Sequence, residues 1–465
     1  MFITCNENKY GIRSGKYVIN GKSVKTPTIF AISDIGGGGG SVDRFISYID
    51  MFYSQGLPIL MNYYYLTEGG SVSINWVRKI KTNEGILDFL SRRNKEMKSN
   101  GKVSNNYSPI QSNYTTPIVM LDSGSGNFVR DFARNGTRDD IISGLEGRIE
   151  NYYEYGQNHG FDILIALDYA FKKTNKAGES SDSNYKDTAG QLIIGNENLD
   201  ILRKSLVKYK NGNYSFMLFA PIHGETSIEI SHSLEKILKI EDIIEAKFSG
   251  FAITFPNTRT NQEMSRGEFI QCIGYAARRV LRERKDQRPI HALGMGGAGN
   301  VLSLVSSGVD SFDTHTPWRR AMDGENPSSA NFKNSTNAYS KYLNPLINQN
   351  LDIIENKPGS EALKYLILPK ILNTIQPDCP ICMKYPIKQL KQLYNNKNKE
   401  DFYLSKMLIY MHSVLQSKYI GQALVKASQN ETDFQLFINS LPSKYRLIFS
   451  GNSKCWNQEI LSDKM

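Results

Sequence analysis

Eight short apolar runs constrain the fold of this chain more than any other feature of its sequence. Most are separated by stretches long enough for a helix, and their apolarity is continuous, as in strands buried on both faces of a parallel sheet. We therefore predict an α/β fold, a TIM-type (β/α)8 barrel with insertions, with a doubly wound open sheet as the alternative. The runs are residues 28–32, 57–62, 118–122, 163–168, 216–221, 250–255, 289–294 and 309–313.

The length of the chain, 465 residues, exceeds the size at which a single hydrophobic core stops growing. From about residue 360 the composition changes to Lys, Leu, Tyr and Asn with helical spacing, most clearly over residues 403–416 and 420–441. We therefore expect a barrel domain that carries the active site over residues 1–358 and a helical C-terminal subdomain over residues 359–465.

Three of the predicted strands end in an aspartate, and these are Asp122, Asp168 and Asp313. The carboxyl ends of barrel strands meet at one rim, where active sites of this fold lie. Carboxylates that converge there can act as a nucleophile or exchange protons with a substrate. A single strand-end aspartate is equally well explained as the N-cap of the next helix, but three of them favour a shared pocket.

The chain carries a formal net charge of +10 and has a pI of about 9.1. Such a charge suits a polyanionic partner, because Lys and Arg that neutralise phosphates release counterions. Net charge does not say where the charges lie, so it leaves a nucleic-acid partner open. Arg319 and Arg320 follow the strand of Asp313 and are candidates for contacting phosphates, with ordinary exposed arginines as the alternative.

No run of the sequence approaches the ~18 apolar residues that a membrane span requires. The first residues lack the basic and apolar regions of a signal peptide. We therefore expect a cytoplasmic protein that does not contact a membrane. Five cysteines over this length do not make a disulfide framework.

Two cysteines and a histidine suggest a metal site in the C-terminal part. Cys379 and Cys382 are separated by two residues, and His412 follows after residues with helical spacing. Two thiolates in a tight turn and a distant His can bind one tetrahedral ion, so structural Zn²⁺ is the natural candidate. Without a metal, these side chains would be ordinary packed residues. The candidates for a fourth ligand are Asp378, Cys455, Cys272 and water.

Together these motifs resemble those of the tRNA-guanine transglycosylase superfamily, whose members exchange guanine in a nucleic acid for a 7-deazaguanine base. The family's nucleophile motif, Phe-Asp-x-x-x-Pro-x-Arg, matches residues 312–319, which implies that Asp313 is the nucleophile. The family's Asp-Ser-Gly-Gly with a following aromatic residue is similar to residues 122–128, which implies that Asp122 handles protons at the base. A further family aspartate, which recognises the purine edge, matches Asp168.

The resemblance covers roughly residues 25–415 and implies further contacts with the base. The family's Leu-Met-Gly-x-Gly resembles residues 292–296, which implies that Leu293 lies beneath the base. Residues 62–66 resemble the family's Asn-Thr-Tyr-His-Leu. The other base-contacting residues that the resemblance implies are Ser123, Phe128, His223 and Gly294.

Two departures from the family pattern indicate a divergent branch. The family's Val-Gln-Gly-Gly, whose Gln binds the incoming base, appears here as Ile-His-Gly-Glu at residues 222–225. The family's zinc motif, Cys-x-Cys-x-x-Cys with a later His, is matched in its last three ligands by Cys379, Cys382 and His412, while Pro377 stands at the place of the first. Divergent barrels of this kind resemble the DpdA-type branch.

Resemblance to that branch implies an enzyme that inserts 7-cyano-7-deazaguanine into DNA through a covalent aspartyl-glycosyl intermediate, alongside accessory modification-system proteins. The target nucleotide would have to be flipped out of the stack. One alternative is a tRNA-guanine transglycosylase with the same chemistry. The other is a catalytically inactive barrel subunit that binds nucleic acid.

Overall fold

A computed structural model of the chain contains a closed barrel of eight parallel strands, arranged around the barrel in the order in which they follow one another in sequence. Closure occurs where the last strand pairs with the first, with Phe312 opposite Ile29. The predicted (β/α)8 barrel is thus confirmed, and the open sheet is excluded. The strands are β4 (Thr28–Ile32), β5 (Ile59–Asn62), β6 (Val119–Asp122), β7 (Ile163–Ile165), β8 (Met217–Ile222), β9 (Gly250–Ile253), β10 (Ile290–Ala292) and β11 (Ser311–Asp313).

The structure describes residues 1–32, 45–68, 80–81, 83–109, 116–128, 138–168, 196–224, 226–254, 265–297, 299–318, 380–385, 389, 392–393, 396–441 and 443–449.

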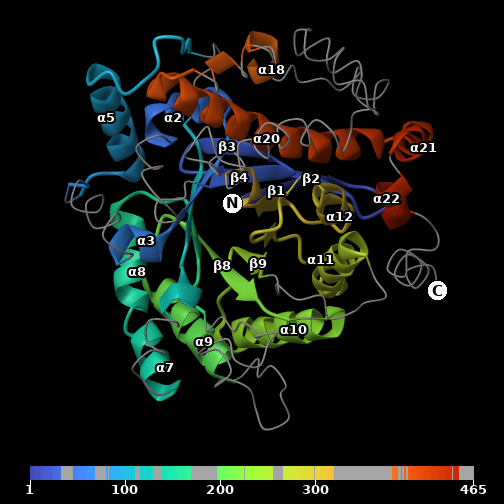
Figure 1. Cartoon of the computed structure of the whole chain (residues 1–465). Coiled ribbons are helices and arrows are strands. Elements are labelled where there is room, and N and C mark those ends of the chain that lie inside the picture. Colours follow the sequence, from blue (N-terminus) through green and yellow to red (C-terminus); the bar gives the residue numbers. More distant parts are fainter. Residues whose placement is uncertain are drawn as a thin grey trace, which may run out of the picture.

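Helices surround the barrel on its outer face, and α8, α9 and α10 follow one another along its lower side in Figure 1. The two longest of the barrel-region helices named here start at capping boxes, in which Thr226 pairs with Glu229 and Ser265 with Glu268. These helices are α2 (Ile49–Ser54), α3 (Tyr63–Thr67), α5 (Ile86–Ser99), α7 (Arg138–Glu146), α8 (Ile149–Asn158), α9 (Asn196–Asn211), α10 (Ser227–Ile244), α11 (Arg266–Glu283) and α12 (Val301–Ser306).

A three-stranded antiparallel sheet, which the sequence did not lead us to expect, precedes the barrel. It consists of β1 (Phe2–Glu7), β2 (Arg13–Ile19) and β3 (Lys22–Thr26). Buried residues alternate along β2, and Tyr17 packs among residues of the barrel interior such as Phe30 and Phe219. Lys22 pairs with Asp162, just before β7, so the sheet covers the barrel end at which the strands begin.

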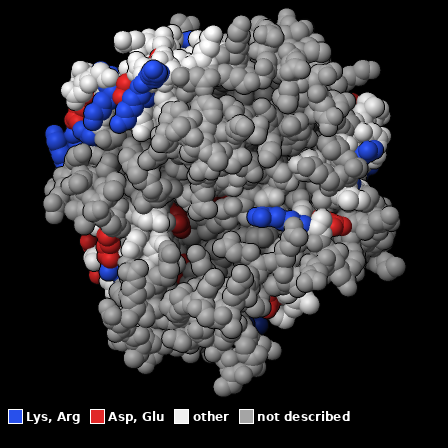
Figure 2. All heavy atoms as spheres, in the orientation of Figure 1, with Lys and Arg blue, Asp and Glu red and all other residues white. Residues whose placement is uncertain are grey.

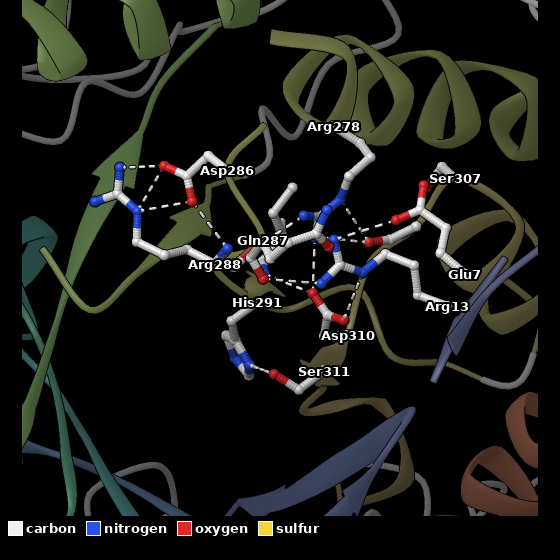
Figure 3. Close-up of polar contacts among 12 residues, drawn as sticks. Glu7, Arg13, Arg278, Asp286, Gln287, Arg288, His291, Ser307, Asp310 and Ser311 are labelled. Atoms are coloured by element: carbon white, nitrogen blue, oxygen red, sulfur yellow. Dashed lines mark hydrogen bonds and ion pairs between the residues drawn. The ribbon is translucent and has the colours of Figure 1, made fainter. Parts of the chain in front are cut away.

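Buried charges also attach this sheet to the barrel. Asp310, directly before β11, accepts a hydrogen bond from Arg278 at 2.7 Å and forms an ion pair with Arg13 at 3.2 Å (Figure 3). Oδ2 of Asp310, the oxygen that accepts from Arg278, also accepts from the backbone N–H of Ile290 at 2.9 Å. This end of the barrel is therefore fixed by matched charges from β2, α11 and the start of β11.

The described residues of the C-terminal part are mostly helical, as predicted, and α20 packs directly on the barrel. The 29-residue helix α20 lies against β4 and α12, and across the top of Figure 1. The Tyr410 hydroxyl donates to the Ile32 carbonyl at 2.7 Å, and its ring meets Trp318 edge-on. The predicted boundary between residues 358 and 359 lies outside the described residues. The elements are α18 (Pro380–Lys384), α20 (Lys399–Ala427), α21 (Glu431–Ser440), α22 (Ser443–Arg446) and the 3-10 helix η3 (Leu447–Phe449).

No helix in the described part of the chain combines the length and the apolarity that crossing a bilayer needs.

Candidate active site

Two adjoining pockets, of about 200 and 260 Å³, lie at the barrel end where the strands finish. Asp122 lines both, Asp168 lines the first, and Asp313 lines the second. The structure therefore brings the three predicted aspartates to one cavity system. Other residues common to both walls are Asn62, Thr254 and Leu293.

Asp122 ends β6 beside Asn62, which ends the neighbouring strand β5. The Asn62 amide donates to Oδ2 of Asp122 at 2.7 Å, and its oxygen caps α3 by accepting from the Tyr65 N–H. The next turn needs glycine: Gly124 has φ +69°, and a Cβ there would lie 2.5 Å from the Asn62 oxygen. Asp122 is thus held by a short, tightly packed turn.

The electrostatic surroundings of Asp122 bring its pKa into the range that proton exchange requires. Burial, followed by the negative charges of Asp168 and Asp313, raises the pKa of Asp122 to about 7, although the hydrogen bonds from Gly124 and Asn62 oppose the shift. A carboxyl group with a pKa near neutrality both gives and takes a proton readily, as a general acid–base catalyst must.

Asp313, the last residue of β11, is almost fully buried and anchored through one oxygen. Its Oδ1 accepts from Nε2 of His291 and from the backbone N–H of Gly294, each at 3.0 Å. Gly294 adopts φ +72°, which presents that N–H to the carboxylate at little steric cost. Oδ2 has no hydrogen-bond partner among the described residues, so the second oxygen is left for a reacting atom.

Asp168 lies just beyond β7, and its backbone N–H donates to Oγ of Ser125 at 3.0 Å. Its Oδ2 is 2.6 Å from Nε2 of His223, and the other ring nitrogen of His223 is 2.6 Å from the Thr254 hydroxyl. His223 therefore reaches from the end of β8 to a carboxylate at the end of β7. The Ser125 hydroxyl also pairs with that of Ser123 at 2.8 Å.

The remaining predicted site residues are placed as follows. Ser123, Leu293 and Gly294 line the pockets. Phe128 lies apart from the pocket walls at 1% exposure, with Tyr64 edge-on and the guanidinium of Arg148 4.6 Å above its ring. This placement favours support of the rim over contact with a base. The predicted phosphate contacts, Arg319 and Arg320, lie outside the described residues.

The predicted zinc ligands are only partly within the described chain. Cys379 lies outside it, and Cys382 belongs to α18 without a described side chain. His412 is fully buried in α20. Cys272, considered above as a fourth ligand, takes part in a disulfide, which leaves no thiolate for a metal. Among the residues that the structure does describe, no cluster of His, Cys, Asp and Glu could hold a metal ion.

Comparison with protein families decides the class of this site. A model of the queuine tRNA-ribosyltransferase family matches residues 113–417, well over half of the chain. The chain belongs to this family. Membership confirms the resemblance to tRNA-guanine transglycosylases and identifies an enzyme of the glycosyltransferase type that acts on a nucleic acid and a guanine base. No curated protein matches the chain.

Several residues of this family member's pocket were not among those selected from sequence. Asn62 belongs to a motif that was compared with the family without a role being given to it. Tyr65 belongs to the same motif and lines one pocket, and Thr254 lines both. His291 carried a usable signal, because it is a polar residue in the middle of the apolar run 289–294.

Proposed function

We propose that this enzyme replaces guanine in DNA with 7-cyano-7-deazaguanine through a covalent intermediate on Asp313. The observation that supports this best is the carboxylate of Asp313, anchored through Oδ1 by two donors while Oδ2 is free on the wall of a pocket that also holds Asp122. A nucleophile and a proton-exchanging group at one cavity are what a two-step base exchange requires.

In the first step, Oδ2 of Asp313 attacks C1′ of the target nucleotide and the C1′–N9 bond breaks. The bonding electrons leave with guanine, and protonated Asp122 gives its proton to the departing base. This produces a neutral base and a glycosyl ester on Asp313. A pKa of about 7 for Asp122 supports this role, because much of the group is protonated at neutral pH.

In the second step, N9 of the incoming 7-deazaguanine attacks C1′, and Asp313 departs as a carboxylate. The proton from N9 passes to Asp122, which restores the starting state. Asp168 is proposed to accept hydrogen bonds from the N1–H and the exocyclic amine of either base, a donor pair that adenine does not present. Its contact with His223 leaves acceptor sites, since a carboxylate accepts about four hydrogen bonds.

Leu293 supports the base in this proposal, since it lies on the walls of both pockets. Ser123 and Gly294 would contact the base through backbone groups. Basic side chains gather over α5, at the upper left of Figure 2, but Arg92 and Arg93 there pair with Glu84 and Glu96. Because these arginines already have acidic partners, we do not assign the phosphate contacts to α5. We propose Arg319 and Arg320 as the ligands of the nucleic-acid phosphates.

DNA is preferred over tRNA because residues 222–225 depart from the family's base-binding segment, with His223 in the place of Gln. The description of the family itself favours tRNA as the second candidate. Accessory modification-system proteins and a cytoplasmic location remain part of the proposal.

Incubation with radiolabelled 7-cyano-7-deazaguanine and either duplex DNA or tRNA tests the proposal, with Asp313→Asn as the matched control. We expect label in DNA with the wild type and none with the variant. Label in tRNA alone would show that the DNA assignment is wrong. Failure to label either nucleic acid, by folded protein supplied with its partners, would favour an inactive binding subunit.

We also propose structural Zn²⁺ bound by Cys379, Cys382 and His412. Support comes from the packing of α18, which contains Cys382, against α20, which contains His412. The chemistry of two thiolates and an imidazole suits zinc. Purified protein should contain about one zinc ion per chain, and Cys382→Ser should lose it together with thermal stability. Equal zinc content in the wild type and the variant would rule out this ligand set.

A further inference from the structure

A row of hydrogen bonds runs through the barrel interior from the N-terminal sheet to Asp313. The Tyr17 hydroxyl lies 2.8 Å from Oγ of Ser311, and the same Oγ lies 2.9 Å from Nδ1 of His291. Nε2 of His291 then meets Oδ1 of Asp313 at 3.0 Å. The first three side chains are fully buried and Asp313 is 3% exposed, so the row is shielded from water. The contact of His291 with Ser311 is visible in Figure 3.

The donor and the acceptor of each hydrogen bond in this row follow from the groups at its two ends, Asp313 and Tyr17. Ionised Asp313 can only accept, so Nε2 of His291 must carry a proton. If the ring is neutral, Nδ1 is an acceptor and receives the proton of Ser311. The Ser311 oxygen then accepts from Tyr17. Every donor thus has one acceptor, and all three hydrogen bonds point toward the carboxylate.

Tyr17 and Phe30 hold the row in place. Burial is the main cause that raises the pKa of Tyr17 far above its ordinary value, so its hydroxyl remains a donor. The ring of Phe30, on β4, packs edge-on against His291 with centroids 5.3 Å apart and leaves the imidazole little rotational freedom. Both contacts favour a single ring orientation.

We infer that His291 is a positioning residue for the nucleophile, with Nε2–H directed at Oδ1 of Asp313 and Nδ1 accepting from the Ser311 hydroxyl, which Tyr17 holds in turn. This relay fixes Oδ1 and thereby directs Oδ2 at C1′. In the ester intermediate, Oδ1 becomes the carbonyl oxygen, and the N–H groups of His291 and Gly294 remain directed at it. They therefore stabilise the carboxylate that leaves in the second step.

This inference rests on the proposed function for its catalytic consequence but not for the state of the ring. The ¹⁵N NMR spectrum of protein labelled at histidine reports the tautomer directly, and the His291 signals are those that disappear in His291→Gln. We expect a proton on Nε2 and none on Nδ1. A ring protonated at Nδ1, or at both nitrogens, would overturn the inference whatever the enzyme acts on.

Kinetics test the positioning role. His291→Leu should slow covalent-adduct formation roughly 10- to 100-fold without changing KM for the nucleic acid, as loss of a residue behind a reacting group does. His291→Gln, which retains an N–H donor, should recover part of that loss. Ser311→Ala should give a smaller reduction, and Tyr17→Phe the smallest, with the tautomer signal shifted in Ser311→Ala.

These outcomes separate the two proposals. If the wild type forms no adduct on DNA or tRNA, the proposed function fails, while the NMR result still decides the relay. If His291→Leu does not fold, Ser311→Ala and Tyr17→Phe carry the kinetic test. Adduct formation within twofold of the wild type in folded His291→Leu and Ser311→Ala would overturn the positioning role.

Discussion

Two carboxylates at opposite ends of strand β11 have contrasting surroundings. Asp310, just before the strand, is 1% exposed and paired with the guanidinium groups of Arg13 and Arg278 (Figure 3). Asp313, at the other end, is 3% exposed, and within the described part of the chain no Lys or Arg pairs with it. Its donors are an imidazole and a backbone N–H. One strand thus carries a charge-matched carboxylate and an unmatched one.

The difference indicates that the carboxylate at the start of β11 contributes to stability, while the carboxylates at the other end of the barrel are available to the pocket. Burying a carboxylate is unfavourable unless a cation accompanies it, and Arg13 and Arg278 satisfy that condition at one end. Burial lowers the pKa of Arg278 to about 10, which still leaves it charged at neutral pH. At the other end no cation accompanies the carboxylates, and burial, followed by the repulsion from Asp168 and Asp313, raises the pKa of Asp122. The carboxylates at that end therefore line the pockets without a compensating Lys or Arg among the described residues.

Replacement of the unmatched carboxylate should have the largest effect on activity. Asp313→Asn keeps the shape but removes the nucleophile, so base exchange should fall by at least roughly 10⁴-fold with no covalent adduct. The free energy of unfolding should change by no more than about 1 kcal/mol, since no cation loses its partner. Labelled-base incorporation and denaturant unfolding measure the two quantities. Adduct formation by the variant would place the nucleophile elsewhere.

Replacement of the matched carboxylate should reverse that pattern. Asp310→Asn leaves two buried guanidinium groups without their shared anion and should lower the free energy of unfolding by about 3–5 kcal/mol. Chemical denaturation measures the loss, and any protein that remains folded should still form the adduct. Asp242→Asn is the matched control, because its pair with Arg284 is exposed and should contribute less than about 1 kcal/mol. Equal effects of the two variants would contradict the contrast.

Removal of one of the repelling carboxylates should stabilise the fold in a pH-dependent way. Folded protein holds the Asp122 proton up to about pH 7, whereas the unfolded chain releases it near its ordinary value of 3.8. Between these values the folded state binds more protons, so this group makes stability fall as pH rises. The free energy of unfolding of Asp122→Asn should therefore exceed that of the wild type by up to about 4 kcal/mol at pH 8 and by little at pH 4. Denaturant unfolding at the two pH values measures the difference.

The same variant should lose base exchange, because an amide cannot give a proton to guanine. Asp242→Asn serves again as the control and should show no such pH-dependent gain. A difference in the free energy of unfolding between Asp122→Asn and the wild type that stays constant from pH 4 to pH 8 would show that the pKa of Asp122 is not raised in the folded protein.

The sequence was sufficient for the barrel because continuous apolar runs report burial on both faces of a strand, and each of the eight runs overlaps a strand. It missed the sheet β1–β3, whose alternating pattern in β2 is short and lies in a polar segment. The three aspartates were found because strand ends share a rim. The relay from Tyr17 to His291 was not predicted, since it depends on the contact between Tyr17 and Ser311, which are 294 positions apart and meet only in the closed barrel.

The smallest effect concerns the hydrogen bond that holds Asp122. Base exchange should decline above about pH 7, because ionised Asp122 has no proton to give to the leaving guanine. The Asn62 amide stabilises the ionised form, so its loss should raise the pKa of Asp122 and move the decline to higher pH, by less than about one unit. Asn62→Ser is the suitable change because its hydroxyl can still cap α3.

Measurement of kcat/KM from pH 5 to pH 9 compares this variant with the wild type and with Thr67→Ala. Thr67 belongs to α3, and its hydroxyl donates to the Tyr63 carbonyl, so its loss should leave the midpoint unchanged. A shift to lower pH in Asn62→Ser would mean that Asn62 stabilises the protonated carboxyl. Hydrogen bonding would then favour the protonated form of Asp122, and the raised pKa of Asp122 would be due to hydrogen bonding as well as to burial.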